Sequence, residues 1–342
     1  MQMTLDHFGR PISYYLYQCF GFFSAAEGFF FLSGFVGMMA AASKQVKDPK
    51  QSWMRRRAVR IWVYHMLTLV GLALLALVAI PNLESYFKPL YEHPLQATFW
   101  ASLMVYTPMW LDVLPLYVVF LLIGSFAFPL LARARNRRSV VALWLPSLAI
   151  WIAAQFGLRD AVNSLLPAWI HHGSFDPFGW QFAYFTGAAT IAWWKLSKAC
   201  AADSKSWNAV RVVNSLTPLL MVVFVFCFLW SHQFVKVPLP SDFWVDKCHL
   251  GILRFANFYV FTLLICWIVR IRQNWLDFRP LNTIGRHSLD VYTAHIVLIY
   301  MWFTVVPNSV RYHLPWDVVI PAFVCFLLWV LAKFREPKAP KV

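Results

Sequence analysis

Residues 18–42 read QCFGFFSAAEGFFFLSGFVGMMAAA, an apolar run that is long enough to cross a lipid bilayer as one helix. The run holds a single carboxylate, Glu27, and a carboxylate inside a membrane segment costs about 2.5–3.5 kcal/mol on insertion scales. A chain that keeps such a residue uses it for a buried site or for a polar network between helices. The run therefore predicts a transmembrane helix, and Glu27 indicates where to look for function.

The composition extends this prediction to the whole chain. Its 342 residues are 60% hydrophobic and 13% charged, whereas typical globular domains are about 25% charged. Further apolar segments of bilayer-spanning length lie near 61–80, 113–132, 139–156, 178–194, 212–231, 251–269, 288–306 and 316–333. Because these segments are continuously apolar and do not alternate, they indicate helices and not a β-barrel. We expect an all-α, polytopic transmembrane bundle of about nine complete spans, formed by one domain over residues 1–342 in contact with membrane lipids.

The connectors predict the orientation of the bundle. Lys and Arg gather in alternate connectors, at 44–60, 133–138, 195–211, 270–286 and in the tail 334–342. This pattern places these connectors and the C-terminal tail in the cytoplasm, as in a multi-pass protein of a bacterial inner (plasma) membrane. It also accounts for the net charge of +15, so nucleic acid is not an expected partner. The short apolar stretch 96–111 would break the alternation as a span, and we interpret it as interfacial or re-entrant.

The start of the chain needs its own interpretation. The alternation places residues 9–17 outside, yet Met1–Phe8 is far too short to reach that side from the cytoplasm. We therefore interpret Met1–Phe8 as the outer end of a first helix whose beginning is truncated. A full-length chain would then have ten spans.

Polar residues within the spans gather in one region. Counted from the span ends, most of them lie in the outer half of the bundle, as expected for a polar cavity open to the outside. The candidate catalytic residues are His7, Glu27 and Arg254. A supporting polar set comprises Asp6, Ser33, Asp112, Gln181, Asn257 and His295.

Each candidate also has a purely structural interpretation. Glu27 could pair with Arg254, and the arginine could instead snorkel to the interface. Asp112 could cap the helix that follows it, and Ser33 and Gly34 suit close helix packing. The two histidines could be an interfacial residue and an interhelical one. No metal site is predicted, because the chain has no H-x-x-x-H or H-E-x-x-H motif.

The polar residues occur within longer patterns, which are Leu5-Asp6-His7, the segment from Phe22 to Val36 around Ala26-Glu27-Gly28, Asp112-Val113-Leu114-Pro115-Leu116-Tyr117, Pro177-Phe178-Gly179-Trp180-Gln181, Leu253-Arg254 to Asn257-Phe258, and Gly285 to His295. Together these patterns resemble the OpgC family of multi-span inner-membrane proteins, which are linked to succinyl modification of osmoregulated periplasmic glucans. The family is similar in turn to the wider membrane acyltransferase-three superfamily. The resemblance covers nearly the whole chain.

The resemblance implies O-acyl transfer to hydroxyls of an extracytoplasmic glucan or other glycan. The donor would be a cytoplasmic acyl-CoA, with succinyl-CoA expected, and proteins of glucan synthesis would be partners. His7 matches the essential histidine base of the superfamily, whereas the arginine that usually precedes it by about three turns is absent here. Histidine, with an ordinary pKa near 6.5, suits the removal of a hydroxyl proton. Glu27 or Asp6 would orient the imidazole, and Arg254 or backbone groups would stabilise the oxyanion.

Two other functions stay open at this stage. Buried Glu, Arg and His residues also suit a transporter or flippase of a glycan or lipid-linked intermediate, although no inverted repeat is visible. A non-catalytic truncated homologue is the other alternative. The sequence does not decide the acyl group, the acceptor, the oligomeric state, or whether transfer is direct or covalent.

Overall fold

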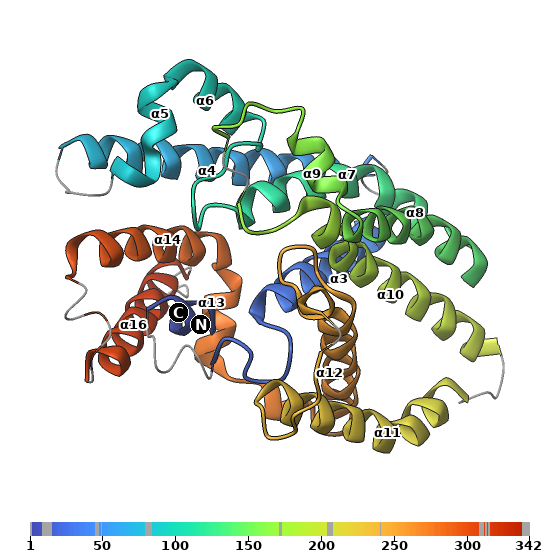
Figure 1. Ribbon diagram of the computed structural model, residues 1–342. Helices are drawn as coiled ribbons and strands as arrows, with labels where there is room; N and C mark the ends of the chain where they lie inside the picture. The colour runs from blue at the N-terminus through green and yellow to red at the C-terminus, as the bar shows by residue number, and fades with distance from the viewer. Residues whose placement is uncertain are drawn as a thin grey trace, which may run out of the picture.

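The computed structural model describes residues 2–8, 16–44, 48, 50–78, 84–170, 173–203, 208–239, 241–307, 311, 313 and 315–336. Throughout these ranges the regular structure is helical and contains no strand, which confirms the all-α prediction (Figure 1). The α-helices are α1 (Gln2–Phe8), α3 (Ala25–Lys44), α4 (Ser52–Val78), α5 (Lys88–Glu92), α6 (Pro94–Ser102), α7 (Val113–Ala132), α8 (Arg137–Gln155), α9 (Leu158–Asn163), α10 (Pro177–Asp203), α11 (Asn208–Ser231), α12 (Ile252–Ile271), α13 (Arg279–Arg286), α14 (Ser288–Val305) and α16 (Trp316–Arg335).

Seven helices are long and apolar enough to cross a membrane, and they are α3, α4, α7, α8, α12, α14 and α16. Each coincides with one of the expected spans. The other two expected spans fall on α10, which is less apolar, and on α11, whose described apolar part is Ser215–Ser231. The number of spans therefore stays a prediction.

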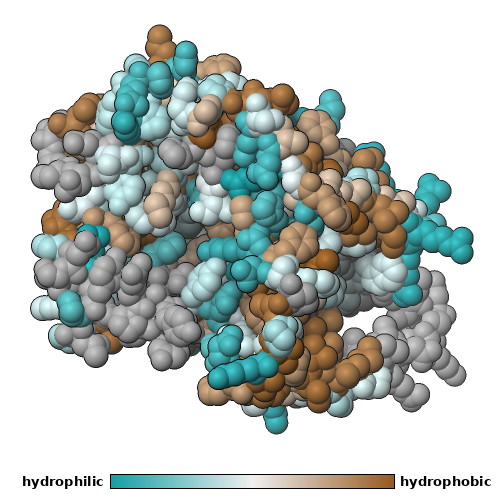
Figure 2. All heavy atoms as spheres, in the orientation of Figure 1, coloured by the Kyte–Doolittle hydropathy of each residue, from teal (hydrophilic) through white to brown (hydrophobic). Residues whose placement is uncertain are grey.

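Apolar side chains cover much of the outer surface of these helices. Leu32 and Val36 on α3 and Leu67 and Leu74 on α4 are all more than half exposed. Figure 2 shows hydrophobic residues over α11 and α12 at the bottom of the view, and hydrophilic residues gathered nearer its middle. Water would not stabilise so much exposed apolar surface, whereas lipid does, so the chain is a multi-pass membrane protein.

The stretch 96–111 does not form a span. Helix α6 ends at Ser102 and is 9 residues long, which gives a length of about 14 Å at 1.5 Å per residue. The following segment turns back into the protein, where Tyr106 and Leu111 are completely buried. Positive φ angles at Met104 and Trp110 make the turns that prevent a continuous helix.

The helices bury two hydrophobic clusters. One contains residues of α3, α7, α8, α10 and α12, and the other contains residues of α1, α6, α14 and α16, while α4 contributes to both. In Figure 1, α7, α8 and α10 lie together on the right, and α13, α14 and α16 lie together on the left. The short helix α1 packs against α14 and α16.

Helices α3 and α10 pack so closely that two glycines are required between them. A Cβ atom on Gly34 would lie 1.8 Å from the backbone oxygen of Tyr184, and a Cβ atom on Gly187 would lie 2.1 Å from that of Phe31. The expectation that this part of α3 serves close helix packing is therefore confirmed for Gly34.

We expect Gly34→Ala to destabilise the protein, because the added methyl group must push α3 away from α10. Overpacking of this kind typically costs about 1–3 kcal/mol. The measurement is thermal unfolding in detergent, followed by size-exclusion chromatography of the remaining folded fraction. Gly71→Ala on α4 is the matched control, because nothing lies within 4 Å of a Cβ atom there. Equal stability of the two variants would contradict the close packing.

Candidate active site

A cavity of about 150 Å³ lies between the two hydrophobic clusters. This is roughly ten times the ~10–15 Å³ of free space that one water needs, so the cavity has room for a small chemical group. Segments distant in sequence build its wall, and most of them lie just before a helix. The polar residues that line it are Gln2, His7, Tyr17, Ser24, Asp112, Ser174, Lys247 and Tyr292.

His7 lies at the end of α1 and presents its imidazole to this cavity. The ring stacks on that of His295 from α14, with centroids 5.4 Å apart and the two planes within 3°. His7 Nδ1 and His295 Nε2 are both buried and have no hydrogen-bond partner among the described residues. An imidazole nitrogen without a partner is free to accept a proton from a ligand in the cavity. The structure thus brings together His7 and His295, the two histidines of the predicted set.

Asp112 also lines the cavity, just before α7. Its carboxylate does not cap that helix, and Oδ2 instead accepts a hydrogen bond of 2.7 Å from the backbone N–H of Ser174. The preceding Gly173 allows this approach, because a Cβ atom there would lie 2.1 Å from Asp112 Cβ. Asp112 therefore joins the loop before α10 to the start of α7 at the cavity wall.

Glu27 and Arg254 form a completely buried ion pair between α3 and α12. Arg254 Nε donates to Glu27 Oε1, while Glu27 Oε2 accepts from both the backbone N–H and the hydroxyl of Ser24, each at 2.9 Å. Arg254 Nη2 also donates to the Ser24 hydroxyl at 3.2 Å. Within the described residues neither member of the pair makes a hydrogen bond with His7. The pair instead holds Ser24, which lines the cavity.

Two further residues of the predicted set link separate segments of the chain and lie outside the cavity lining. Gln181 on α10 bonds to α8 by accepting from the Ser147 hydroxyl at 2.6 Å and donating to the Ser147 carbonyl at 2.8 Å. Asn257 Oδ1 accepts from the backbone N–H of Phe22 at 2.8 Å. Both residues fix segments around the cavity. The side chain of Asp6 lies outside the described residues.

A second cavity, of about 560 Å³, lies at the start of helices α4 and α14. Its lining is strongly basic and includes Arg56, Arg57, Arg60, Arg286 and His287, together with Ser33 of the predicted set. Asp290 is the one carboxylate among the described residues that line it, and it accepts a hydrogen bond from Tyr64 at 2.9 Å. The side chain of Tyr292 lines this cavity as well as the first, so the two are neighbours across a single tyrosine.

The sequence alone did not indicate the role of Lys247 or Tyr17. Lys247 lies in the connector before α12 and Tyr17 in the one before α3, and the ammonium of Lys247 sits 4.7 Å from the centroid of the Tyr17 ring. One signal was present, since Lys247 is a basic residue in a connector predicted to lie outside, where the positive-inside rule disfavours lysine.

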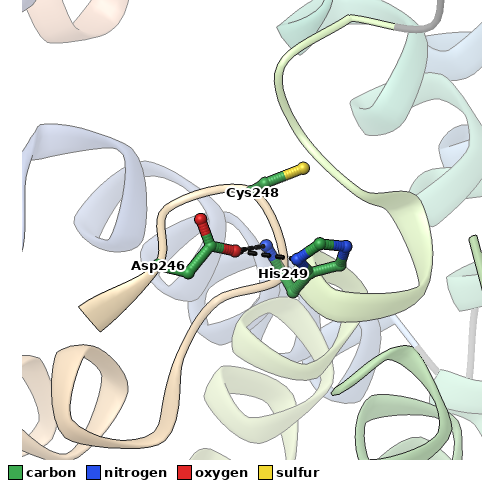
Figure 3. Close-up of side chains that lie close together, drawn as sticks. All are labelled: Asp246, Cys248 and His249. Atoms are coloured by element: carbon green, nitrogen blue, oxygen red, sulfur yellow. Dashed lines mark hydrogen bonds and ion pairs between the residues drawn. The ribbon is translucent and has the colours of Figure 1, made fainter. Parts of the chain in front are cut away.

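Asp246, Cys248 and His249 flank Lys247 and place three potential metal-ligand atoms within 4.8 Å of one another (Figure 3). These atoms already have partners in the protein. His249 Nδ1 lies 2.8 Å from Asp246 Oδ2, and Arg159 donates to the Cys248 sulfur at 2.6 Å. An arginine on the thiol opposes the approach of a cation, so the arrangement describes a hydrogen-bonded turn rather than a metal centre.

These features define a helical, multi-pass membrane protein with a buried polar site next to a basic cavity. The sequence profile of the family described as OpgC protein matches residues 1–339, and the chain belongs to that family. The match covers essentially the whole chain, as the resemblance predicted. Membership of this family suggests a glucan-modifying membrane protein. No curated protein and no solved structure matches the chain.

Proposed function

We propose that this protein is a membrane O-acyltransferase, which moves a succinyl group from succinyl-CoA to a hydroxyl of an extracytoplasmic glucan. The observation that carries the proposal is the contact of the two cavities at Tyr292. One cavity offers a buried imidazole to a reacting hydroxyl, and the other offers cations to an anionic donor. Transfer between substrates on opposite sides of a membrane requires such an arrangement.

The basic cavity suits the donor. Acyl-CoA carries its acyl group at the end of a long arm that follows a diphosphate, and arginines bind phosphate by paired, charge-assisted hydrogen bonds. Arg56, Arg57 and Arg60 lie in the first three turns of α4 and within the basic stretch 44–60 that the positive-inside rule assigns to the cytoplasm. CoA bound there would direct its thioester past Tyr292 towards His7.

His7 acts as the base in this mechanism. Its imidazole takes the proton of the sugar hydroxyl as the oxygen attacks the thioester carbonyl. The tetrahedral intermediate then collapses, the carbon–sulfur bond breaks, and the leaving thiolate receives the proton from the imidazolium. The products are the sugar ester and free CoA, and the histidine is again neutral. His295 supports the ring of His7 by stacking on it.

Glu27 and Arg254 contribute mainly by position in this proposal. The charges of Glu27 and Arg254 neutralise each other, and the hydrogen bonds that the two side chains make with Ser24 hold it at the cavity wall. The Ser24 hydroxyl and the backbone groups beside it would then face the oxyanion. Proteins of glucan synthesis would present the acceptor from the outside.

Purified protein in liposomes tests the proposal directly. With succinyl-CoA on the side of the basic connectors and a glucan on the other, we expect release of free CoA thiol and a mass increase of the glucan. Both signals should require the glucan and the donor together. Glucan uptake or flipping without any acyl donor, in the absence of ester formation, would overturn the proposal in favour of transport.

A further inference from the structure

The cavity that holds His7 contains a cation, Lys247, that forms no ion pair with any described carboxylate. Lys247 lines this cavity, and among the described residues no carboxylate lies within the 4.0 Å of an ion pair with its ammonium. Asp112 lines the same cavity and its charge acts on Lys247 at a longer distance, while its Oδ2 accepts a hydrogen bond from the backbone N–H of Ser174. A charge in a partly buried site without a partner is costly, and an anionic ligand removes that cost.

Aromatic rings fix the direction of this lysine. Its ammonium lies 4.7 Å from the centroid of Tyr17 and 5.4 Å from that of Phe175. Contacts of this kind between a cation and the faces of aromatic rings are attractive. They leave hydrogen-bond donors of the ammonium for a ligand, because an aromatic face takes no classical hydrogen bond.

The turn around Lys247 is built to hold the backbone in place. The carboxylate of Asp246 accepts from the backbone N–H of His249 at 2.7 Å and from its ring (Figure 3). Burial by itself would raise the pKa of Asp246, but these hydrogen bonds outweigh it and hold the pKa below its ordinary value. Trp180 donates to the carbonyl of Lys247 itself at 2.9 Å. These hydrogen bonds hold the backbone of the turn on both sides of Lys247. The side chain of Lys247 is thereby directed at the cavity.

Arg254, another cation near the cavity, does not have this freedom. The guanidinium of Arg254 is neutralised by Glu27 and bonded to Ser24. A ligand that carries a negative charge would therefore find its partner in Lys247. The acceptor sugar is neutral, and the thioester is neutral as well, so the charge must be on the acyl chain.

We propose that Lys247 binds the distal carboxylate of a dicarboxylic acyl group and so makes the enzyme select succinyl over neutral acyl groups. The inference rests on the proposed function, because it assigns a specificity-determining residue to that same cavity. The ammonium forms a charge-assisted hydrogen bond with the carboxylate, while the thioester end of the chain faces His7. Selection follows from charge, since acetyl and propionyl groups cannot form this pair.

The test compares donors in one preparation. Transfer from succinyl-CoA and from propionyl-CoA is measured for the wild type and for Lys247→Gln. We expect the variant to lose about 10- to 100-fold in kcat/KM with succinyl-CoA, the range of a hydrogen bond to a charged group, and to keep its activity with propionyl-CoA. Lys247→Arg should keep the preference for succinyl. Lys236→Gln is the control, because Lys236 is an exposed lysine in the same connector.

The ratio of the two donors does not depend on how much variant protein folds. An equal loss with both donors would overturn the inference and assign Lys247 to the oxyanion or to stability. The wild type offers a second test, since the monomethyl ester of succinyl-CoA has the same chain without the charge. Equal rates with the ester and the free acid would also overturn it. Failure of the proposed function looks different, because the wild type would then transfer no acyl group at all.

Discussion

A His7→Ala variant is expected to lose acyl transfer by about 10²- to 10⁴-fold, the usual contribution of a general base. The reason is that His7 presents to the cavity an imidazole whose buried Nδ1 has no other described hydrogen-bond partner. Without it, the sugar hydroxyl must attack as a neutral oxygen. The measurement is the rate of CoA thiol release in liposomes that contain donor and acceptor, together with mass analysis of the glucan.

The loss of acyl transfer must be distinguished from a loss of folded protein. His7→Gln keeps a polar side chain of similar reach and should be equally inactive while eluting as a folded membrane protein. His93→Ala serves as the control, because His93 is exposed, contacts the Trp169 ring at a tilt and does not line the cavity. Transfer by His7→Ala at more than a tenth of the wild-type rate would remove His7 from the role of base.

A Glu27→Ala variant is expected to be destabilised by about 3–5 kcal/mol, the cost of leaving one charge of a buried pair without its partner. Glu27 and Arg254 are 0% and 1% exposed, so water cannot replace the lost carboxylate. The loop that carries Ser24 would also lose two hydrogen bonds. Thermal unfolding in detergent, monitored by tryptophan fluorescence, measures the loss of stability.

A double variant distinguishes the effect of removing both charges of the pair from the effect of removing only one. Glu27→Met with Arg254→Met removes both charges, and we expect it to recover much of the lost stability, because apolar replacements of buried pairs are often tolerated. The exposed pair Lys88–Glu92 is the matched control, with side chains 69% and 53% exposed. Breaking it with Glu92→Ala should cost less than about 1 kcal/mol. A similar cost at both pairs would show that burial of Glu27 does not matter.

The sequence predicted the helices well, because membrane insertion leaves little freedom. A backbone in lipid must satisfy its own hydrogen bonds, so long apolar runs such as 113–132 and 252–271 have to be helical. The same reasoning recognised that 96–111 is too short for a span. It also predicted a span at 178–194, where Gln181, two glycines and several Trp and Tyr residues keep α10 less apolar than the seven helices that are long and apolar enough to cross a membrane.

The sequence located only some of the residues that the structure brings together around this cavity. Depth along the helices placed His7 and Asp112 on the outer side of the bundle and His295 about a third of the way up its span from the cytoplasm, whereas the structure brings all three near the same cavity. The depth of a residue along its own helix does not show which side chain of a neighbouring helix it faces. The partners Glu27 and Arg254 lie 227 positions apart, and their pairing was only one of several alternatives until the tertiary contacts showed it.

By itself, the sequence determined that this chain is a helical membrane protein of the OpgC family and that polar residues lie inside its bundle. These properties follow from local composition and motif, which each segment carries without its neighbours. Only the tertiary structure decided which of the described polar residues bond to each other and which have no partner among them. It tied Glu27 to Arg254, left His7 open to a cavity, and brought Lys247 to the same place from a distant turn. Such choices depend on how helices pack, because a charged group is available to a substrate only where folding has given it no partner.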